Sequence, residues 1–335
     1  MVLNDSRGRP LRDLRLSVTD RCNFRCGYCM PKTAFGPDHP FLRRSDLLRY
    51  EEIERLAGLL VDLGVRKIRL TGGEPLLRRD LPDLVSRLAA IEDVDDLSLT
   101  TNGVLLAGQA AGLARAGLQR VTVSLDSVDD ATFRRMIDAD VPVDTVLAGI
   151  DAARAAGLAP IKINAVVRRG VNDDTIVDLA RHFQGTGCVV RFIEYMDVGT
   201  TNGWRLDQVV TGEEILARLR TAFDLRPVEP AYPGEVARRY EDAAQGFELG
   251  IITAVSRPFC RTCTRLRLSP DGHLFTCLFA SDGLDLRGPL REGVTDAGLR
   301  DRVARLWAGR VDRYSEQRAG ATAGLPRIEM SYIGG

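Results

Sequence analysis

Three cysteines, Cys22, Cys26 and Cys29, form a C-x3-C-x2-C pattern directly after an apolar stretch at 14–18. On a loop, three thiols this close in sequence can turn toward one point. Cysteine thiolates are the usual ligands of iron–sulfur clusters, and four of them saturate a cubane. Three leave one iron without a protein ligand, and catalytic metal sites keep such an open position. The pattern therefore predicts a reactive 4Fe-4S cluster with room for a small chelating ligand.

Two other interpretations of these cysteines are less favourable. A disulfide is disfavoured, because seven cysteines in 335 residues without a secretory signal indicate a reducing compartment. A zinc ion usually takes four ligands, and the loop holds neither a histidine nor a fourth cysteine.

A second set, Cys260, Cys263 and Cys277, has C-x2-C-x13-C spacing. With His273 it would form a C-x2-C-x9-H-x3-C zinc site, whereas the three cysteines alone would hold another cluster with an open iron. Spacing leaves both possibilities open. Cys188 is left over, and we expect it to be a buried strand cysteine.

Strand-like and helix-like stretches alternate up to about residue 204. The expected strands are 14–18, 65–71, 97–101, 120–125, 161–167 and 189–195, and the expected helices are 50–63, 81–91, 109–116, 144–156 and 174–183. This alternation predicts parallel βαβ units and an α/β fold. Without a dinucleotide fingerprint, a partial, TIM-like (βα)6 barrel fits better than a Rossmann sheet. We expect two domains, a barrel at 1–225 and a C-terminal domain at 226–335 that carries the second cysteine set.

In such barrels the chemistry lies at the carboxyl ends of the strands. The first cysteine set follows the first expected strand, and the second strand ends in Thr-Gly-Gly-Glu-Pro at 71–75. Glycines allow a close approach of the backbone to a ligand, and Glu74 can accept a hydrogen bond from an ammonium, although an ordinary glycine turn is the alternative. Met196 could pack on an adenine or, more commonly, in the core.

The composition excludes some partners. The chain has 46 basic and 46 acidic residues, so no general attraction to nucleic acid or to an anionic membrane follows. No apolar run approaches the length needed to span a bilayer. We expect a cytoplasmic protein with no nucleic-acid or membrane partner.

The first cysteine set, with Tyr28 before its last cysteine, resembles the signature of the radical S-adenosylmethionine (SAM) superfamily. The whole chain resembles the GTP 3',8-cyclases of molybdenum-cofactor biosynthesis within that superfamily. The matching segments are 14–22, 71–75, Arg191-Phe-Ile-Glu194, both cysteine sets and the terminal Gly334-Gly335.

This resemblance implies a lyase with two 4Fe-4S clusters, on Cys22, Cys26 and Cys29 and on Cys260, Cys263 and Cys277. SAM bound to the first cluster would be cleaved to a 5'-deoxyadenosyl radical that removes the C3' hydrogen of GTP. C3' then attacks C8, and reduction gives 3',8-cyclo-7,8-dihydro-GTP. The second cluster would hold the purine.

The resemblance also implies roles for individual residues. SAM would be bound by Tyr28, Gly73, Glu74, Thr100, Ser124 and Met196, with Thr100 also at the GTP. GTP would be bound by Arg15, Arg69, Lys162, Arg265, Leu266 and Arg267. Arginine forks match phosphate oxygens, and Arg265 and Arg267 alternate on an expected strand, so they share one face. The Gly334-Gly335 tail would reach into the active site, where a terminal carboxylate could meet an arginine.

The resemblance further implies a reductant such as flavodoxin or ferredoxin, and transfer of the product to cyclic pyranopterin monophosphate synthase. It leaves the choice between monomer and homodimer open. Two alternatives remain. One is a binding protein stabilised by zinc on the Cys260 set. The other is a peptide-maturing radical SAM enzyme, although its auxiliary region usually contains more cysteines.

Overall fold

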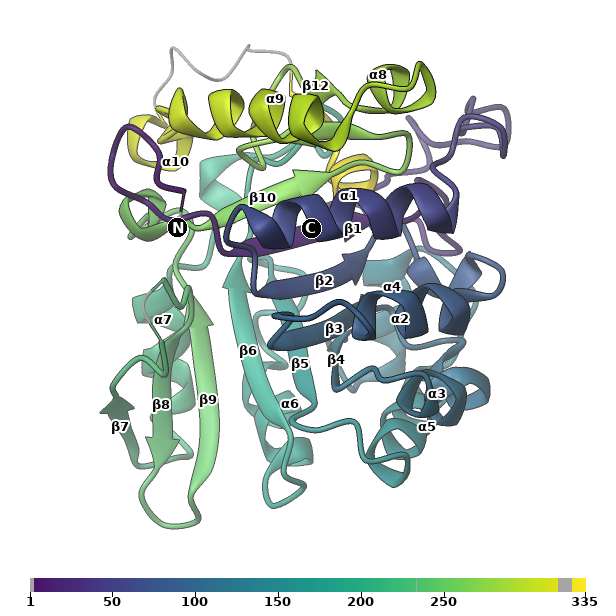
Figure 1. Ribbon diagram of the computed structural model, residues 1–335. Coiled ribbons are helices and arrows are strands. Elements are labelled where there is room, and N and C mark those ends of the chain that lie inside the picture. Colours follow the sequence, from purple (N-terminus) through teal and green to yellow (C-terminus); the bar gives the residue numbers. More distant parts are fainter. Residues whose placement is uncertain (1–2, 233, 319–326) are drawn as a thin grey trace.

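The computed structural model describes residues 3–232, 234–318 and 327–335 (Figure 1). One twelve-stranded sheet forms the frame, in the order β12-β11-β10-β1-β2-β3-β4-β5-β6-β9-β8-β7. Its strands are β1 (Asp13–Ser17), β2 (Lys67–Thr71), β3 (Asp96–Thr101), β4 (Arg120–Ser124), β5 (Lys162–Val167), β6 (Val189–Glu194), β7 (Leu225–Val228), β8 (Arg238–Asp242), β9 (Phe247–Ile252), β10 (Arg265–Leu268), β11 (His273–Phe275) and β12 (Leu284–Asp285).

Strands β1 to β6 are parallel and correspond to the six expected runs, which confirms the α/β barrel prediction. Helices of this half cover the outer face of the sheet (Figure 1). They are α1 (Tyr50–Asp62), α2 (Leu81–Ala89), α3 (Leu106–Arg115), α4 (Asp130–Ile137), α5 (Val143–Ala155) and α6 (Ile176–Phe183). The sequence analysis missed α4. This helix has only eight residues, and its N-terminal signal is the cap in which Asp129 accepts a hydrogen bond from Thr132 N.

The segment after residue 225 extends the sheet at both edges. β9 pairs in parallel with β6, and β10 pairs in parallel with β1, so the C-terminal strands flank the barrel strands on either side. The remaining helical elements are η1 (Pro75–Leu77), η2 (Leu206–Gln208), α7 (Gly212–Leu219), η3 (Cys260–Thr262), α8 (Arg287–Arg291), α9 (Asp296–Ala308), α10 (Tyr314–Gln317) and α11 (Met330–Ile333). The division into domains at residue 225 stays a prediction.

Side chains alternate across the strands and so separate the core from the barrel interior. Leu14 and Leu16 of β1 are buried in the hydrophobic core with the outer helices, whereas Arg15 lies on the opposite face. Arg15 is in register with Arg69 of β2 and with Arg267 of β10. Three guanidinium groups therefore project from neighbouring strands on the inner side of the sheet.

A buried carboxylate joins the end of β6 to later parts of the chain. Glu194 accepts hydrogen bonds from Gly212 N at 2.6 Å, Val255 N at 2.7 Å and Ser256 N at 2.8 Å. These contacts satisfy backbone donors at the start of α7 and in the turn after β9. In the part of the chain that the structure describes, no helix has the length and apolar character needed to cross a membrane.

Candidate active site

One cavity inside the barrel is lined by all six cysteines of the two sets. The first set follows the carboxyl end of β1, while Cys263 precedes the amino end of β10, the parallel neighbour of β1. Cys277 follows β11, which runs antiparallel to β10, so it lies at the same end as Cys263. The two sets therefore lie at opposite ends of a strand pair that spans roughly 16 Å at the usual rise per residue. The rule that places chemistry at the carboxyl ends of the strands did not predict the position of the second cysteine set.

The Cys22 set lies on a tight turn. Cys29 N and Met30 N both donate to Cys26 O at 2.9 Å, and Phe24 is buried against Phe133. Burial raises the pKa of Cys22 to about 11 and raises the pKa values of Cys26 and Cys29 as well. These thiols stay protonated until a cation stabilises the thiolates, so metal binding must release protons.

The geometry does not match a single bound ion. Among the described residues, no group of three or more His, Cys, Asp or Glu side chains is placed to hold one metal ion. The predicted zinc alternative for the second set also lacks support, because His273 lies outside the lining of the cavity and its Nδ1 is 3.3 Å from Asp271 Oδ1. Each set offers three thiols, which is the donor chemistry of a cluster with one open iron.

The glycines at 72–73 have a role that the sequence analysis did not predict. A Cβ on Gly73 would lie 2.3 Å from Arg21 O, and one on Gly72 would lie 2.5 Å from Thr19 O. Gly73 N donates to Thr19 O at 2.7 Å. These glycines let the loop after β2 lie directly against the segment that leads into the first cysteine set.

Glu74 is 1% exposed and links two strand ends. Its Oε1 accepts hydrogen bonds from Leu76 N at 3.0 Å and Thr101 Oγ1 at 2.7 Å, and its Oε2 accepts one from Asn102 N at 2.7 Å. Burial raises its pKa to about 7 against these donors, which favour the ionised form. The carboxylate thus fixes the loops after β2 and β3 beside the first cysteine set.

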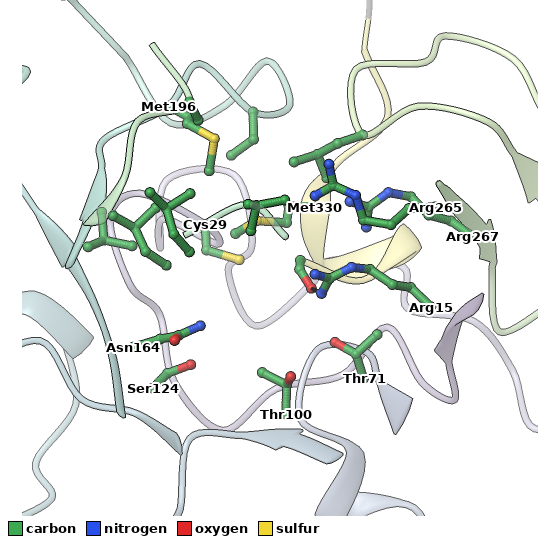
Figure 2. Close-up of a pocket in the computed structure, with 18 of the residues that line it drawn as sticks. Arg15, Cys29, Thr71, Thr100, Ser124, Asn164, Met196, Arg265, Arg267 and Met330 are labelled. Carbon is green, nitrogen blue, oxygen red and sulfur yellow. Dashed lines mark hydrogen bonds between the residues drawn. The ribbon is translucent and has the colours of Figure 1, made fainter. Parts of the chain in front are cut away.

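Polar residues from β3, β4 and β5 line the same cavity, and Figure 2 shows Thr100, Ser124 and Asn164 near one another. Thr100 Oγ1 and Asn164 Oδ1 are buried without a hydrogen-bond partner in the described chain. Both residues line the cavity, so a ligand bound there would supply the missing partners. The sequence analysis missed Asn164; its only signal was a buried-strand position between apolar neighbours.

Tyr28 and Met196 also line the cavity. Tyr28 OH donates to Asp126 Oδ2 at 2.9 Å, and Asp126 Oδ1 accepts from Val166 N at 2.8 Å. Burial raises the pKa of Asp126 to about 6. The contact between Asp126 and Tyr28 depends on tertiary packing, since the two residues are far apart in the sequence.

Four arginines line the cavity from strands that run between the two cysteine sets: Arg15, Arg69, Arg265 and Arg267. Figure 2 shows Arg15, Arg265 and Arg267 on the same side of the cavity. Burial and then the charge of Arg69 lower the pKa of Arg15, and burial lowers the pKa of Arg267 and of Arg69 to about 10 each. Burying several like charges is unfavourable without a counterion. This group is therefore suited to a polyanion.

Two residues that were expected to bind GTP do not present their side chains to the cavity. Leu266 is fully buried in the hydrophobic core, because it alternates with Arg265 and Arg267 on β10, and only its backbone remains for a ligand. Lys162 at the start of β5 is outside the cavity lining, although it is close enough to Arg69 to feel its charge. Burial, followed by the charges of Arg191, Arg120 and Arg69, lowers its pKa to about 7.

The second cysteine set lies in a more positive environment than the first. Burial alone would raise the pKa of Cys263, but Arg265 and Arg310 lower it to about 6. Cys277 differs, since burial raises its pKa to about 11.

The C-terminal tail enters the cavity. Arg267 donates to Gly334 O and Arg15 donates to Gly335 O. Gly334 has a φ of +77°, and a Cβ there would lie 2.2 Å from Thr71 Cγ2, so the position requires glycine. Ile333 is fully buried and anchors the tail.

The whole chain can be compared with known proteins. Residues 16–183 match the model of the radical SAM superfamily, and residues 188–316 match a model described as Molybdenum Cofactor Synthesis C. Among solved structures, SuiB of Streptococcus suis superposes with a TM-score of 0.63 at 14% identity, covering 90% of this chain and 67% of that one. The fold and the family match define the protein as a member of the radical SAM superfamily.

Relatives with higher sequence identity show which family of this superfamily the chain belongs to. GTP 3',8-cyclase of Acidothermus cellulolyticus is 53% identical over 358 residues, and that of Staphylococcus aureus strain JH9 is 48% identical over 337 residues. Each alignment covers 99% of this chain and 99% of the relative. The chain belongs to the GTP 3',8-cyclase family.

Glu74 provides a test of the loop arrangement. Glu74→Gln keeps the shape of the side chain but replaces one carboxylate oxygen with an amide NH2, which cannot accept a hydrogen bond. A backbone N–H then loses its acceptor, and a buried donor left unsatisfied costs about 1–3 kcal/mol. We expect SAM to bind about ten- to hundredfold more weakly, measured by equilibrium dialysis with anaerobic, iron-loaded protein. Exposed Glu51→Gln on α1 is the matched control. Unchanged SAM affinity at full iron content would contradict this role.

Proposed function

We propose that this protein converts GTP into (8S)-3',8-cyclo-7,8-dihydroguanosine 5'-triphosphate, the first step of molybdenum-cofactor biosynthesis. The observation that carries the proposal is one cavity with a three-cysteine set at each end and four arginines between them. The family relationship supports the same reaction.

Each cysteine set would hold one 4Fe-4S cluster. Tyr28, Gly73, Glu74, Thr100, Ser124 and Met196 are the proposed SAM residues, around the end of the cavity that holds the Cys22 set. When bound, the first cluster and SAM supply one-electron radical chemistry. The unsatisfied oxygens of Thr100 and Asn164 offer acceptors for hydroxyl or amino groups of SAM or of the substrate.

The chain's own residues position the substrate. Arg15, Arg69, Arg265 and Arg267 meet the triphosphate, whose negative charge offsets their mutual repulsion. Lys162 adds a fifth cation near this group. With the triphosphate on these arginines and the purine at the second cysteine set, the ribose that joins them would turn C3' toward the first cysteine set.

The proposal extends to partners. A one-electron donor such as flavodoxin or ferredoxin would supply the electron for the radical chemistry at the Cys22 set, and cyclic pyranopterin monophosphate synthase would take the product. Free thiols at six ligand positions require a reducing compartment, which favours the cytoplasm.

The decisive experiment is an anaerobic assay with GTP, SAM and dithionite. We expect a cyclised nucleotide, 5'-deoxyadenosine, and about eight irons per chain. Cys26→Ser should abolish SAM cleavage while the second set retains iron. Zinc with little iron and no nucleotide product would instead favour a metal-stabilised binding protein.

Lys162 makes GTP binding depend on pH. The pKa of Lys162 is about 7, so at pH 7 its amine is uncharged in about half of the GTP-free molecules. A bound triphosphate raises the pKa of this amine. We expect GTP binding to take up about half a proton at pH 7 and to weaken as pH rises above 7. Calorimetry in buffers of different ionisation heat measures the uptake.

We expect Lys162→Met to lose this proton uptake. Its control is Lys32→Met, which removes a lysine paired with Asp138 at the surface. Equal proton uptake by the parent and by Lys162→Met would exclude a phosphate role for Lys162.

The tail can be tested by removing Gly334 and Gly335. This deletion frees the donors of Arg15 and Arg267, so we expect GTP to bind at least as tightly as in the parent. SAM should still be cleaved, but cyclisation should fail, because the tail no longer fixes the substrate. Full cyclase activity at saturating GTP and SAM would show that the tail is dispensable.

A further inference from the structure

Two buried arginines outside the proposed SAM and GTP sets frame the second cysteine set. The Arg310 side chain is 1% exposed; its Nη1 donates to Cys263 O at 2.8 Å and its Nη2 donates to Cys263 Sγ at 3.2 Å. Arg9 Nη1 donates to Cys260 O at 2.9 Å. Both arginines line the cavity.

A network of carboxylates and an indole ring holds Arg310 in place. Its Nε lies 3.2 Å from Asp312 Oδ2, its Nη1 lies 3.7 Å from Asp5 Oδ2, and its guanidinium carbon lies 4.6 Å from the centre of the Trp307 ring. Asp5 in turn bonds Arg9 Nε at 2.5 Å. A guanidinium with this many fixed partners is pre-organised toward the sulfur.

The same network reaches the third cysteine. Thr276, which precedes Cys277, donates through its hydroxyl to Asp312 Oδ2 at 2.5 Å. The N-terminal residues 5–9 and the segment 310–312 thus contact both chain segments that carry the second cysteine set, 260–263 and 276–277.

The first set has different neighbours. The donors to Cys22 Sγ are Phe24 N at 3.4 Å and Asn102 Nδ2 at 3.9 Å, both of them neutral groups. Tyr28 and Asp126 lie next to Cys26 and Cys29. A charged donor on a ligand sulfur is therefore a feature of the second set.

We propose that Arg310 is a positioning residue of the second iron–sulfur centre: it fixes Cys263 and, through its charged N–H···S bond, raises the reduction potential of that cluster. Reduction adds one electron to the cluster. A nearby cation and a hydrogen bond to a ligand sulfur stabilise the added negative charge. This inference rests on the proposed second cluster but not on the reaction with GTP.

The test is a redox titration followed by electron paramagnetic resonance, with full-length protein reconstituted anaerobically in the Cys26→Ser background, without GTP or SAM. That background should hold about four irons, all on the second set. Arg310→Met should disfavour one-electron reduction of this cluster at least tenfold, which corresponds to a potential about 59 mV lower. The matched control is Arg261→Met, an exposed arginine next to Cys260, and it should leave the potential unchanged.

An unchanged potential in Arg310→Met at full iron content would overturn the inference. Should this variant lose its iron, Arg310→Lys decides. The lysine keeps a positive charge beside Asp5 and Asp312, but it lacks the two-pronged guanidinium that donates to both the backbone oxygen and the sulfur of Cys263. A potential in Arg310→Lys equal to that of the parent would overturn the inference, and a lower one supports it. If the Cys26→Ser protein binds no iron at all, the inference fails together with the proposed second cluster.

Discussion

The parallel pairing of β10 with β1 is the constraint on which the site depends. It places Arg267 beside Arg15, and the pairing of β1 with β2 adds Arg69 to the same row. Because β1 leads into one cysteine set and β10 begins just after the other, the same pairing sets the distance between them. A shift of the register by one residue would turn the arginines toward the hydrophobic core and the leucines toward the cavity.

The two ends of the cavity differ in their electrostatics. The Cys22 set lies near Glu74 and Asp126, whose pKa values burial raises, and its own thiols resist ionisation. The Cys260 set lies among arginines, which lower the pKa of Cys263. A cluster carries negative charge through its thiolates and sulfides, so the positive end stabilises added electrons more than the other end does. Two centres with the same ligand count can therefore differ in potential because of their surroundings alone.

Local patterns predicted much of this structure. Both cysteine sets, the six barrel strands and the arginine pair on β10 could be predicted because each is a spacing rule within a short segment. Contacts over long sequence separations could not be predicted. The positions of Arg310 at Cys263 and of Asp126 under Tyr28 depend on how distant elements pack, and no spacing in the sequence encodes them. The glycines at 72–73 were identified for the right property, close backbone approach, but their neighbour is the segment before the first cysteine set.

The tail connects the substrate site with the fold itself. Arg15 and Arg267, which the proposed function assigns to the triphosphate, donate to the oxygens of Gly335 and Gly334. A guanidinium has five N–H donors, so one arginine can hold a tail oxygen and a phosphate oxygen together. The anchor at Ile333 and the hydrogen bonds from Thr200 and Thr201 to Glu329 keep the tail at this place without a ligand. On the proposed assignment, the tail oxygens would occupy some of the donors of these arginines, and the triphosphate would bind to the donors that remain. In the proposed function the tail would thereby restrict the orientation of the substrate, which is what a reaction at a single ribose hydrogen requires.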